Sequence, residues 1–270
     1  MKKLFVFDVD GTIATEYKNV NQEVIDCLNE ILNKGHVIAI ASGRPYIGIK
    51  YFLSMLNDGE KYCICTNGTE VTDINGNTLF SKMIPMKDYY DFYSRHLNLL
   101  KNENTNIYCY TYRGLGYFKR DFWVNMECKC NPGLPGIDLN VNRLKDEHPI
   151  LKFMIDTNEE ESKRIENEEI LDIEKDKFRI VRTSNYFLEF FSKEADKAEG
   201  VSFLKRYLNI KNNDDIYTFG DSGNDYLMIK EFHGIAMGNA LKECKDVAKF
   251  VTKSCEENGV VFAIKNYCKL

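Results

Sequence analysis

Two short acidic motifs in this chain carry the residue types and spacing that phosphate chemistry needs. Residues 8–12 read DVDGT and directly follow the apolar run 4–7, and residues 220–225 read GDSGND and directly follow the run 216–219. The end of a buried strand is where open parallel sheets bind their ligands. A carboxylate at Asp8 can act as a nucleophile or bind a hard metal ion, and Asp10 can transfer a proton. Asp8 with Asp221 would give the oxygen-rich site that Mg²⁺ prefers.

Other positions offer groups that bind a phosphoryl oxygen. Gly11 permits a tight turn whose backbone amides face an anion, and Thr12 adds a hydroxyl donor. Ser42, which precedes Gly43 after a second apolar run, can donate to a phosphoryl oxygen or simply cap the following helix. For residues 8–12 the alternative interpretation is a loop capped by two aspartates.

Lys197 and Asn224 complete the set. Lys197 opens the helix-like stretch 197–208, where its charge could neutralise a phosphoryl group, although a lone lysine is more often a solvated surface residue. Asn224 stands beside Asp225 ahead of another helix. The acidic, hydroxyl, lysine and acidic-amide elements follow one another in order, each at the end of a strand or the start of a helix. This order favours one composite site over four unrelated features.

The elements that must position these residues form an α/β pattern at both ends of the chain. Fully apolar runs, which read as buried strands, alternate with helically spaced apolar residues. Asn75-Gly76 within residues 71–80 predicts a hairpin. Both ends are therefore expected to form one doubly wound, Rossmann-like parallel sheet domain, at residues 1–83 and 191–270. Its expected strands are 4–7, 37–41, 62–65, 216–219, 235–237 and 250–252, and its helices are 24–32, 47–56, 197–208, one after 224 and one from 258.

Residues 84–190 have a different pattern and are expected to form an inserted α+β domain. A glycine- and proline-bearing stretch at 131–136 interrupts its regular elements. Helices are expected near 87–100 and over the acidic stretch 158–171, and strands at 107–112, 150–155, 178–183 and 186–191.

The composition narrows the classes of function and partner. The chain has 270 residues, 44% of them hydrophobic, which is enough to fill real cores. A net charge of −5 gives no broad cationic field for nucleic acid. No run approaches the roughly 20 apolar residues that span a bilayer, and nine cysteines without metal-ligand spacing predict reduced thiols. We expect a cytoplasmic protein with neither a nucleic-acid nor a membrane partner. Its oligomeric state is open.

With these motifs in this order, the sequence resembles the haloacid dehalogenase (HAD) superfamily, specifically its Cof-like branch with a C2B-type cap inserted after the third core strand. The resemblance spans essentially the whole chain. It implies that Asp8 is the nucleophile and a metal ligand, that Asp10 is the general acid/base and offers its backbone carbonyl to the metal, and that Asp221 is a further ligand. The implied cofactor is Mg²⁺. One departure is Ala198, where a glycine is more usual.

The same resemblance implies which residues hold the phosphoryl group and which support the metal indirectly. Asp225 would support the metal without binding it. An acid at position 10 is typical of the phosphatases and phosphomutases of this superfamily, not of members that remove halogens or pump ions. The residues implied to hold the phosphoryl group are Thr12, Ser42, Gly43, Lys197 and Asn224.

The expected function is therefore hydrolysis of a small phosphomonoester, such as a sugar phosphate or a cofactor phosphate, through an aspartyl phosphate on Asp8. The inserted domain would close over the site and set specificity. The alternatives are a phosphomutase, or a non-catalytic phosphate-binding or signalling protein, and the substrate itself is open. Residues that could face the cleft, each with an ordinary surface or packing role as the alternative, are Arg44, Asn67, Arg113, His148, Lys152 and Asn185.

Overall fold

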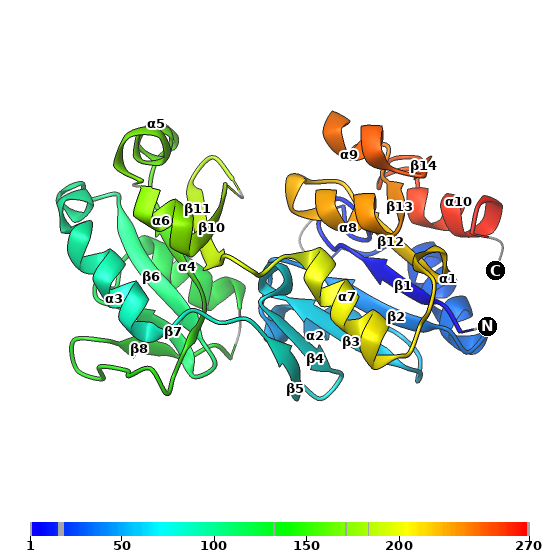
Figure 1. The fold of residues 1–270 in the computed structure, drawn as a ribbon, viewed down its shortest axis with the longest axis horizontal. Coiled ribbons are helices and arrows are strands. Elements are labelled where there is room, and N and C mark those ends of the chain that lie inside the picture. The colour runs from blue at the N-terminus through cyan, green and yellow to red at the C-terminus, as the bar shows by residue number, and fades with distance from the viewer. Residues whose placement is uncertain (1, 16–18, 132, 171, 183, 269–270) are drawn as a thin grey trace. The chain divides into compact units, whose positions relative to one another are not determined.

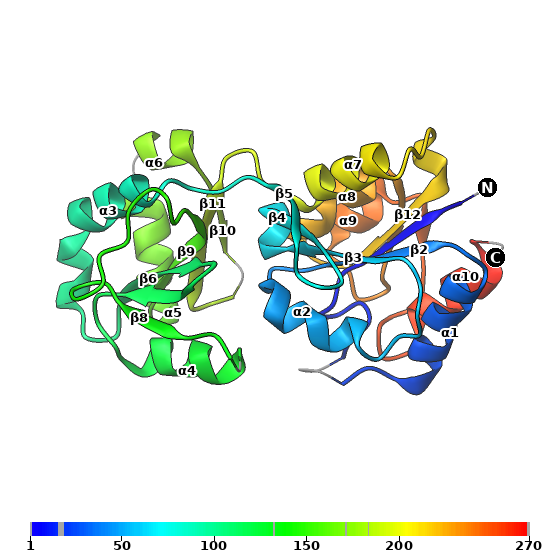
Figure 2. The same cartoon turned by 90° about the horizontal axis from the view of Figure 1, so that it is seen from below.

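A computed structural model describes residues 2–15, 19–131, 133–170, 172–182 and 184–268 (Figures 1 and 2). The chain divides into two compact units, unit 1 with Met1–Ser81 and Asp196–Leu270, and unit 2 with Lys82–Ala195. The second boundary falls later than the expected residue 190. The reason is that strand β11 (Phe187–Ser192) pairs with its neighbour in unit 2 as far as Ser192.

Unit 1 is built on one eight-stranded sheet in the order β14-β13-β12-β1-β2-β3-β4-β5. Its strands are parallel from β14 to β3 and antiparallel from β3 to β5. The predicted α/β class is confirmed, and so is the hairpin at Asn75-Gly76, which joins β4 and β5. The strands are β1 (Leu4–Phe7), β2 (Val37–Ala41), β3 (Lys61–Cys65), β4 (Glu70–Asp73), β5 (Thr78–Ser81), β12 (Ile216–Gly220), β13 (His233–Ala236) and β14 (Phe250–Val251).

Helices cover both faces of this sheet, as Figure 2 shows, which explains why β1, β2 and β12 are buried along their whole length and why β1 and β2 are entirely apolar. Phe5 and Phe7 of β1 belong to the core under α1, α2 and α10, whereas Leu4 and Val6 belong to the core under α7 and α8. The helices are α1 (Gln22–Asn33), α2 (Tyr46–Leu53), α7 (Lys197–Tyr207), α8 (Tyr226–Glu231), α9 (Lys242–Val247) and α10 (Gly259–Asn266).

Unit 2 is an α+β unit on a six-stranded sheet in the order β10-β11-β9-β6-β7-β8, antiparallel except for the pair β7–β8. Tyr89 and Phe92 of α3 pack on one face, and Val124 of α4 packs on the other. The elements are α3 (Met86–Arg95), β6 (Asn106–Thr111), β7 (Gly114–Tyr117), α4 (Phe122–Cys130), β8 (Gly136–Asp138), β9 (Ile150–Asp156), α5 (Glu159–Arg164), α6 (Asp172–Lys177), β10 (Phe178–Arg182) and β11.

Several elements of unit 2 were not predicted. Strand β7 is four residues long and contains two glycines, and α4 buries a single side chain, that of Val124, so neither shows a clear apolar period. The helix expected over 158–171 is shorter, because α5 ends at Arg164 and a π-helical turn, Ile165–Glu169, follows. Periodicity fails in α4 because only one residue is buried, and in β7 because two of its four buried residues are glycines.

Two sequence expectations concern the whole chain. No helix within the described residues has both the length and the apolar composition needed to cross a bilayer. All nine cysteines lie within the described residues and none is in a disulfide, which agrees with the prediction of reduced thiols.

Candidate active site

The topology of unit 1 brings the motif loops to one edge of the sheet. Strand β1 lies between β2 and β12 and is parallel to both, so the three strands end side by side, with Phe7 opposite Ile40 and Phe219. The backbone N–H of Asp8 donates to the carbonyl of Phe219 at 3.0 Å, which continues the ladder by one residue. Asp8, Ser42 and Asp221 therefore leave neighbouring strands at the same edge, where parallel sheets bind ligands.

Lys197 lies between two carboxylates at this edge. It is the first residue of α7 and is fully buried. Its Nζ donates to Oδ1 of Asp8 and to Oδ1 of Asp225, both at 2.6 Å. Burial lowers the pKa of Lys197, but the charges of Asp225 and Asp8 outweigh burial, so its pKa lies above the ordinary value. The sequence suggested a lysine near the site, and the structure places it in direct contact with the proposed nucleophile.

Three carboxylates crowd around this one lysine. Asp8, Asp221 and Asp225 each place one carboxylate oxygen within 4.8 Å of the others. Burial, followed by the charge of Asp225, raises the pKa of Asp221 to about 6 and that of Asp8 well above its usual range. One lysine can neutralise only one of three carboxylates. The excess negative charge and the all-oxygen donor set fit a divalent cation such as Mg²⁺.

Asp225 has a structural part in this cluster. It is fully buried, its Oδ1 accepts from Lys197, and its Oδ2 accepts from the backbone N–H groups of Asp221 at 2.9 Å and Ser222 at 3.0 Å. Both oxygens are thus occupied by donors of the protein. Asp8 and Asp221 are left as the carboxylates that could hold a metal ion, and Asp225 fixes the loop that carries Asp221.

The turn after β1 packs directly on Asp221. Gly11 has φ +82°, and a Cβ there would lie 2.5 Å from Oδ2 of Asp221, so the position requires glycine for both conformation and space. The buried Thr12 hydroxyl donates to Oδ1 of Asp221 at 3.4 Å. Asn239 was not singled out in the sequence; its Nδ2 donates to the Gly11 carbonyl at 3.0 Å and to Oδ2 of Asp221 at 3.3 Å.

Asp10 points its carboxylate toward Arg44. The guanidinium of Arg44 donates from Nη2 to Oδ1 at 2.7 Å and from Nε to Oδ2 at 3.1 Å, a bidentate ion pair at the exposed rim of the loop. Arg44 follows Gly43 in the loop after β2, so this pair joins the first and second motif loops. Asp10 is the one acidic candidate outside the cluster of three carboxylates.

A second chain of contacts connects the remaining candidates through Asn67. Its backbone N–H donates to the Ser42 carbonyl at 2.9 Å, and its Oδ1 accepts from Nδ2 of Asn224 at 2.9 Å. Its side-chain amide also lies 3.4 Å from the position of a Cβ on Gly43. Asn67 is 2% exposed, has φ +54°, and its Nδ2 has no hydrogen-bond partner within the described part of the chain. A buried, unpaired donor beside Ser42 and Asn224 marks a place for an anion.

The structure thus places the candidates of unit 1 in three sets of contacts, around Lys197, around Asn67 and between Asp10 and Arg44. Asn67 was among the residues that the sequence suggested could face the cleft, and the Asn67-Gly68 pair directly after β3 adopts left-handed backbone conformations typical of a turn. No comparable signal marks Asn239. The other possible cleft residues lie in unit 2, where Lys152 is buried in an ion pair with Glu189, Asn185 is exposed, and Arg113 and His148 line a surface pocket.

Comparisons with known proteins match both units together. A family model for haloacid dehalogenase-like hydrolases matches residues 5–264. The chain is 30% identical over 275 residues to a Bacillus subtilis (strain 168) protein named "Putative phosphatase YxeH", covering 98% of this chain and 97% of that protein. It is 26% identical over 267 residues to the 5-amino-6-(5-phospho-D-ribitylamino)uracil phosphatase YcsE of the same organism, covering 98% and 95% of the two chains.

The fold is similar to that of solved structures over the same span. A haloacid dehalogenase-like hydrolase from Bacteroides thetaiotaomicron gives a TM-score of 0.84 at 25% identity and covers 98% of this chain and 99% of that one. The similarity therefore includes unit 2 as well as the sheet that carries the candidate site.

Proposed function

The chain belongs to the haloacid dehalogenase-like hydrolases. We propose that it is a Mg²⁺-dependent phosphatase. It would cleave a small phosphomonoester through a phosphoryl group carried transiently by Asp8. The observation that carries the proposal is the contact of Lys197 Nζ with Asp8 Oδ1 at 2.6 Å in a fully buried setting. That contact orients the Asp8 carboxylate and supplies positive charge beside it. Phosphoryl transfer depends mainly on such positioning and charge stabilisation.

Asp8 and Asp221 are the side chains that would hold the metal ion, together with the backbone carbonyl of Asp10. The bound ion would supply positive charge next to the phosphoryl oxygens. Asp225 would hold the site together by binding Lys197 and the backbone of the Asp221 loop. Asn239, which donates to Oδ2 of Asp221, would keep its carboxylate in position. The Thr12 hydroxyl, which donates to Oδ1 of Asp221 at 3.4 Å, would turn to the phosphoryl group when the substrate binds.

The reaction would proceed in two steps at this edge of the sheet. In the first, a carboxylate oxygen of Asp8 forms a bond to phosphorus while the bond from phosphorus to the ester oxygen breaks, and Asp10 gives a proton to that leaving oxygen. In the second, Asp10 takes a proton from a water molecule, whose oxygen bonds to phosphorus and releases inorganic phosphate and the free Asp8 carboxylate.

Donors from three loops would bind the phosphoryl oxygens. Lys197 offers the charge, Ser42 and Thr12 offer hydroxyls, Asn224 offers its amide, and the Gly43 loop offers backbone N–H groups. Unit 2 would set specificity, since the residues of unit 1 recognise only the phosphoryl group. The named ribitylaminouracil phosphatase among the relatives supports a small organic phosphate as substrate, without identifying which one.

The test is release of inorganic phosphate from a panel of sugar phosphates, pyridoxal phosphate, flavin mononucleotide and an aryl phosphate, with Mg²⁺ or with a chelator. Asp8→Asn is expected to lower kcat by about 10⁴-fold or more, because it removes the nucleophile. Asp26→Asn, which changes an exposed aspartate of α1, is the matched control and should keep wild-type activity.

The metal requirement and the covalent step on Asp8 are tested separately. Chelation should abolish release, and added Mg²⁺ should restore it. Turnover that survives in Asp8→Asn at the wild-type rate would rule out the aspartyl phosphate, and turnover unaffected by chelation would rule out the metal. Transfer of the phosphoryl group back to substrate without net release would indicate a phosphomutase.

A further inference from the structure

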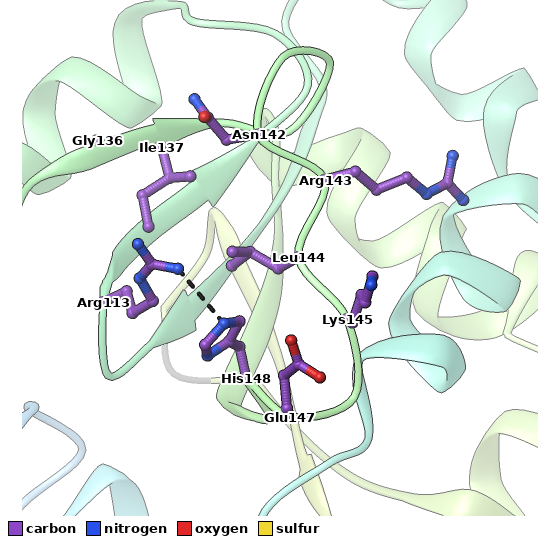
Figure 3. A pocket seen from close by; sticks show the side chains of 9 residues that line it. All are labelled: Arg113, Gly136, Ile137, Asn142, Arg143, Leu144, Lys145, Glu147 and His148. Carbon is purple, nitrogen blue, oxygen red and sulfur yellow. Dashed lines mark hydrogen bonds between the residues drawn. The ribbon is translucent and has the colours of Figure 1, made fainter.

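Unit 2 contains a basic pocket beside the turn between β6 and β7, and we propose that it binds an anionic oxygen group, a phosphate or a carboxylate, of a small organic molecule. The pocket has a volume of about 430 Å³. Figure 3 shows the side chains that line it. Its walls come from the β6–β7 turn, the start of β8 and the loop 142–148. The inference concerns unit 2 alone and does not depend on the function proposed for unit 1.

An arginine and a histidine converge in this pocket. Nη1 of Arg113 donates to Nε2 of His148 at 3.4 Å, and Figure 3 shows the two side chains pointing toward each other. A guanidinium has only donors, so Nε2 of His148 accepts in this contact, whereas in its other tautomer the ring donates from Nε2. An anionic oxygen placed against the pair would accept from both, and such charge-assisted hydrogen bonds are stronger than the contact between the two side chains.

The pocket carries a surplus of positive charge in an acidic protein. Arg143 and Lys145 also line it, against the single carboxylate of Glu147, while the whole chain has a net charge of −5. Among the described residues, none of these three groups, nor Arg113, forms an ion pair. Arg143 instead lies over the Tyr90 ring at 4.5 Å. Three cationic side chains, Arg113, Arg143 and Lys145, therefore face one carboxylate in the pocket, a balance that should attract an anion.

The aspartates that flank this segment are occupied by backbone donors. Oδ1 of Asp146 accepts from the N–H of Lys87 at 2.8 Å, and Oδ1 of Asp138 accepts from the N–H of Asn140 at 2.9 Å. Within the described residues, neither carboxylate forms a hydrogen bond or an ion pair with Arg113 or His148.

The rest of the pocket is shaped for a carbon skeleton behind the anionic group. Ile137 and Leu144 place apolar side chains next to the Arg113–His148 pair (Figure 3). The turn that carries Arg113 is fixed, because Oγ1 of Thr111 accepts from the N–H of Arg113 and of Gly114, each at 3.1 Å. A preformed turn reduces the ordering cost of binding.

The experiment follows the imidazole signals of the full-length protein by NMR while inorganic phosphate or succinate is added at constant ionic strength. The chain has four histidines, so the His148 signal can be assigned with His148→Gln. We expect a saturable shift of this signal. Arg113→Gln should weaken the binding by about tenfold or more, because it removes the charged hydrogen-bond donor.

Two control variants make the result specific. Arg120→Gln removes the same charge from unit 2 outside the pocket, where Arg120 Nε donates to Asn125, and should bind as the wild type does. Asn224→Ala weakens the proposed phosphate site of unit 1. The shift of the His148 signal on addition of phosphate or succinate should be unchanged in this variant, so the result does not depend on whether the protein is a phosphatase.

The proposal would be overturned by a shift that never saturates, or by one of equal size and midpoint in wild type and Arg113→Gln, since either shows ionic screening only. Saturation by phosphate or by succinate supports it. The tighter of the two identifies whether the pocket prefers a phosphoryl or a carboxyl group.

Discussion

Unit 1 and unit 2 each bury a lysine against carboxylate oxygens at 2.6 Å, but at different places in their sheets. Lys197 and its partners Asp8 and Asp225 stand at the ends of strands or the starts of helices. Lys152 and Glu189 instead lie within strands β9 and β11, with their side chains buried on one face of the sheet. The two ion pairs are alike in distance and burial, so their difference lies in what surrounds them.

The surroundings show why one cluster can perform chemistry. After β12 in unit 1 the backbone N–H groups of Asp221 and Ser222 bind the Asp225 carboxylate instead of a neighbouring strand. Within the strands of unit 2 the ladder already uses these groups, and Lys152 is further covered by the Tyr110 ring at 4.8 Å. A buried charge is thus a weak indicator of an active site, and a buried charge at the carboxyl edge of a parallel sheet is a strong one.

The largest difference in kcat between changes in the two units is expected when each buried lysine is replaced by methionine. Lys197→Met should lower kcat by about 10²–10³-fold, because it removes the charge beside the nucleophile. Lys152→Met should leave kcat within about twofold, because Lys152 serves unit 2 as a packed ion pair. Each change leaves a carboxylate buried without its cation, which costs about 3–5 kcal/mol of unfolding free energy. Steady-state kinetics with thermal unfolding separates the two effects.

Lys197→Arg is the control for folding, because it keeps a positive charge next to the buried carboxylates. A guanidinium cannot reproduce both 2.6 Å contacts of the single ammonium group. It should be folded and slow. If Lys152→Met lost activity as strongly as Lys197→Met at equal stability, the contrast between strand-end and mid-strand charges would be wrong.

The sequence predicts the strand-end cluster well because each motif follows a fully buried strand. The positions of Asp8, Ser42 and Asp221 at one edge follow from the parallel order of β1, β2 and β12 alone. The pairing of Asp10 with Arg44 could not be predicted, since it depends on how two loops meet. The same is true of Asn239, which reaches Asp221 from the loop after β13.

Unit 2 is less predictable for a different reason. Its sheet faces are shared between apolar and polar side chains, as with Tyr108, Lys152 and Asp156, so strand periodicity is blurred. Helix α4 buries only Val124, and β7 is short and half glycine although fully buried, so tertiary packing decides their structure. Polar side chains on a buried sheet face cannot be distinguished from surface residues without the fold.

A smaller effect is expected from removing one buried amide from each unit. Asn67→Ala should lower kcat/KM by about tenfold, because Asn224 loses the acceptor that orients its amide. Asn131→Ala removes a buried amide that donates to the Glu127 carbonyl at 3.0 Å in unit 2, and should reduce stability without changing kcat/KM.

Inhibition by inorganic phosphate distinguishes positioning from a general loss of stability. The inhibition constant should rise in Asn67→Ala and stay constant in Asn131→Ala. Equal inhibition constants in all three proteins would show that Asn67 only holds its loop in place.

The last comparison concerns stability alone, at a buried carboxylate of unit 2 that no lysine contacts through a described hydrogen bond. Asp156 is fully buried; the Tyr108 hydroxyl donates to its Oδ2, and its Oδ1 has no partner within the described residues. Burial is the largest cause and raises the pKa of Asp156. The Tyr108 hydrogen bond lowers this pKa and the charges of Glu127 and Glu189 raise it, so it lies well above its usual value. The folded protein therefore keeps a proton on Asp156 at pH values where the unfolded chain, with a pKa near 3.9, has lost it.

The sign of the pH dependence follows from that proton. A carboxyl group whose pKa is higher in the folded state contributes stability that is complete below the unfolded pKa and is lost as pH rises through the folded pKa. The unfolding free energy of the wild type therefore falls as the pH rises above about 4. Asp156→Asn binds no such proton, so its unfolding free energy should rise relative to that of the wild type by up to about 1.4 kcal/mol per pH unit. Urea unfolding at pH 5 and pH 7, with a chelator present so that metal binding in unit 1 stays constant, measures this. If the difference in unfolding free energy between Asp156→Asn and wild type is the same at both pH values, Asp156 is already ionised in the folded protein. Unit 2 would then tolerate a buried carboxylate charge without a contacting lysine, whereas the buried carboxylates of unit 1 have Lys197.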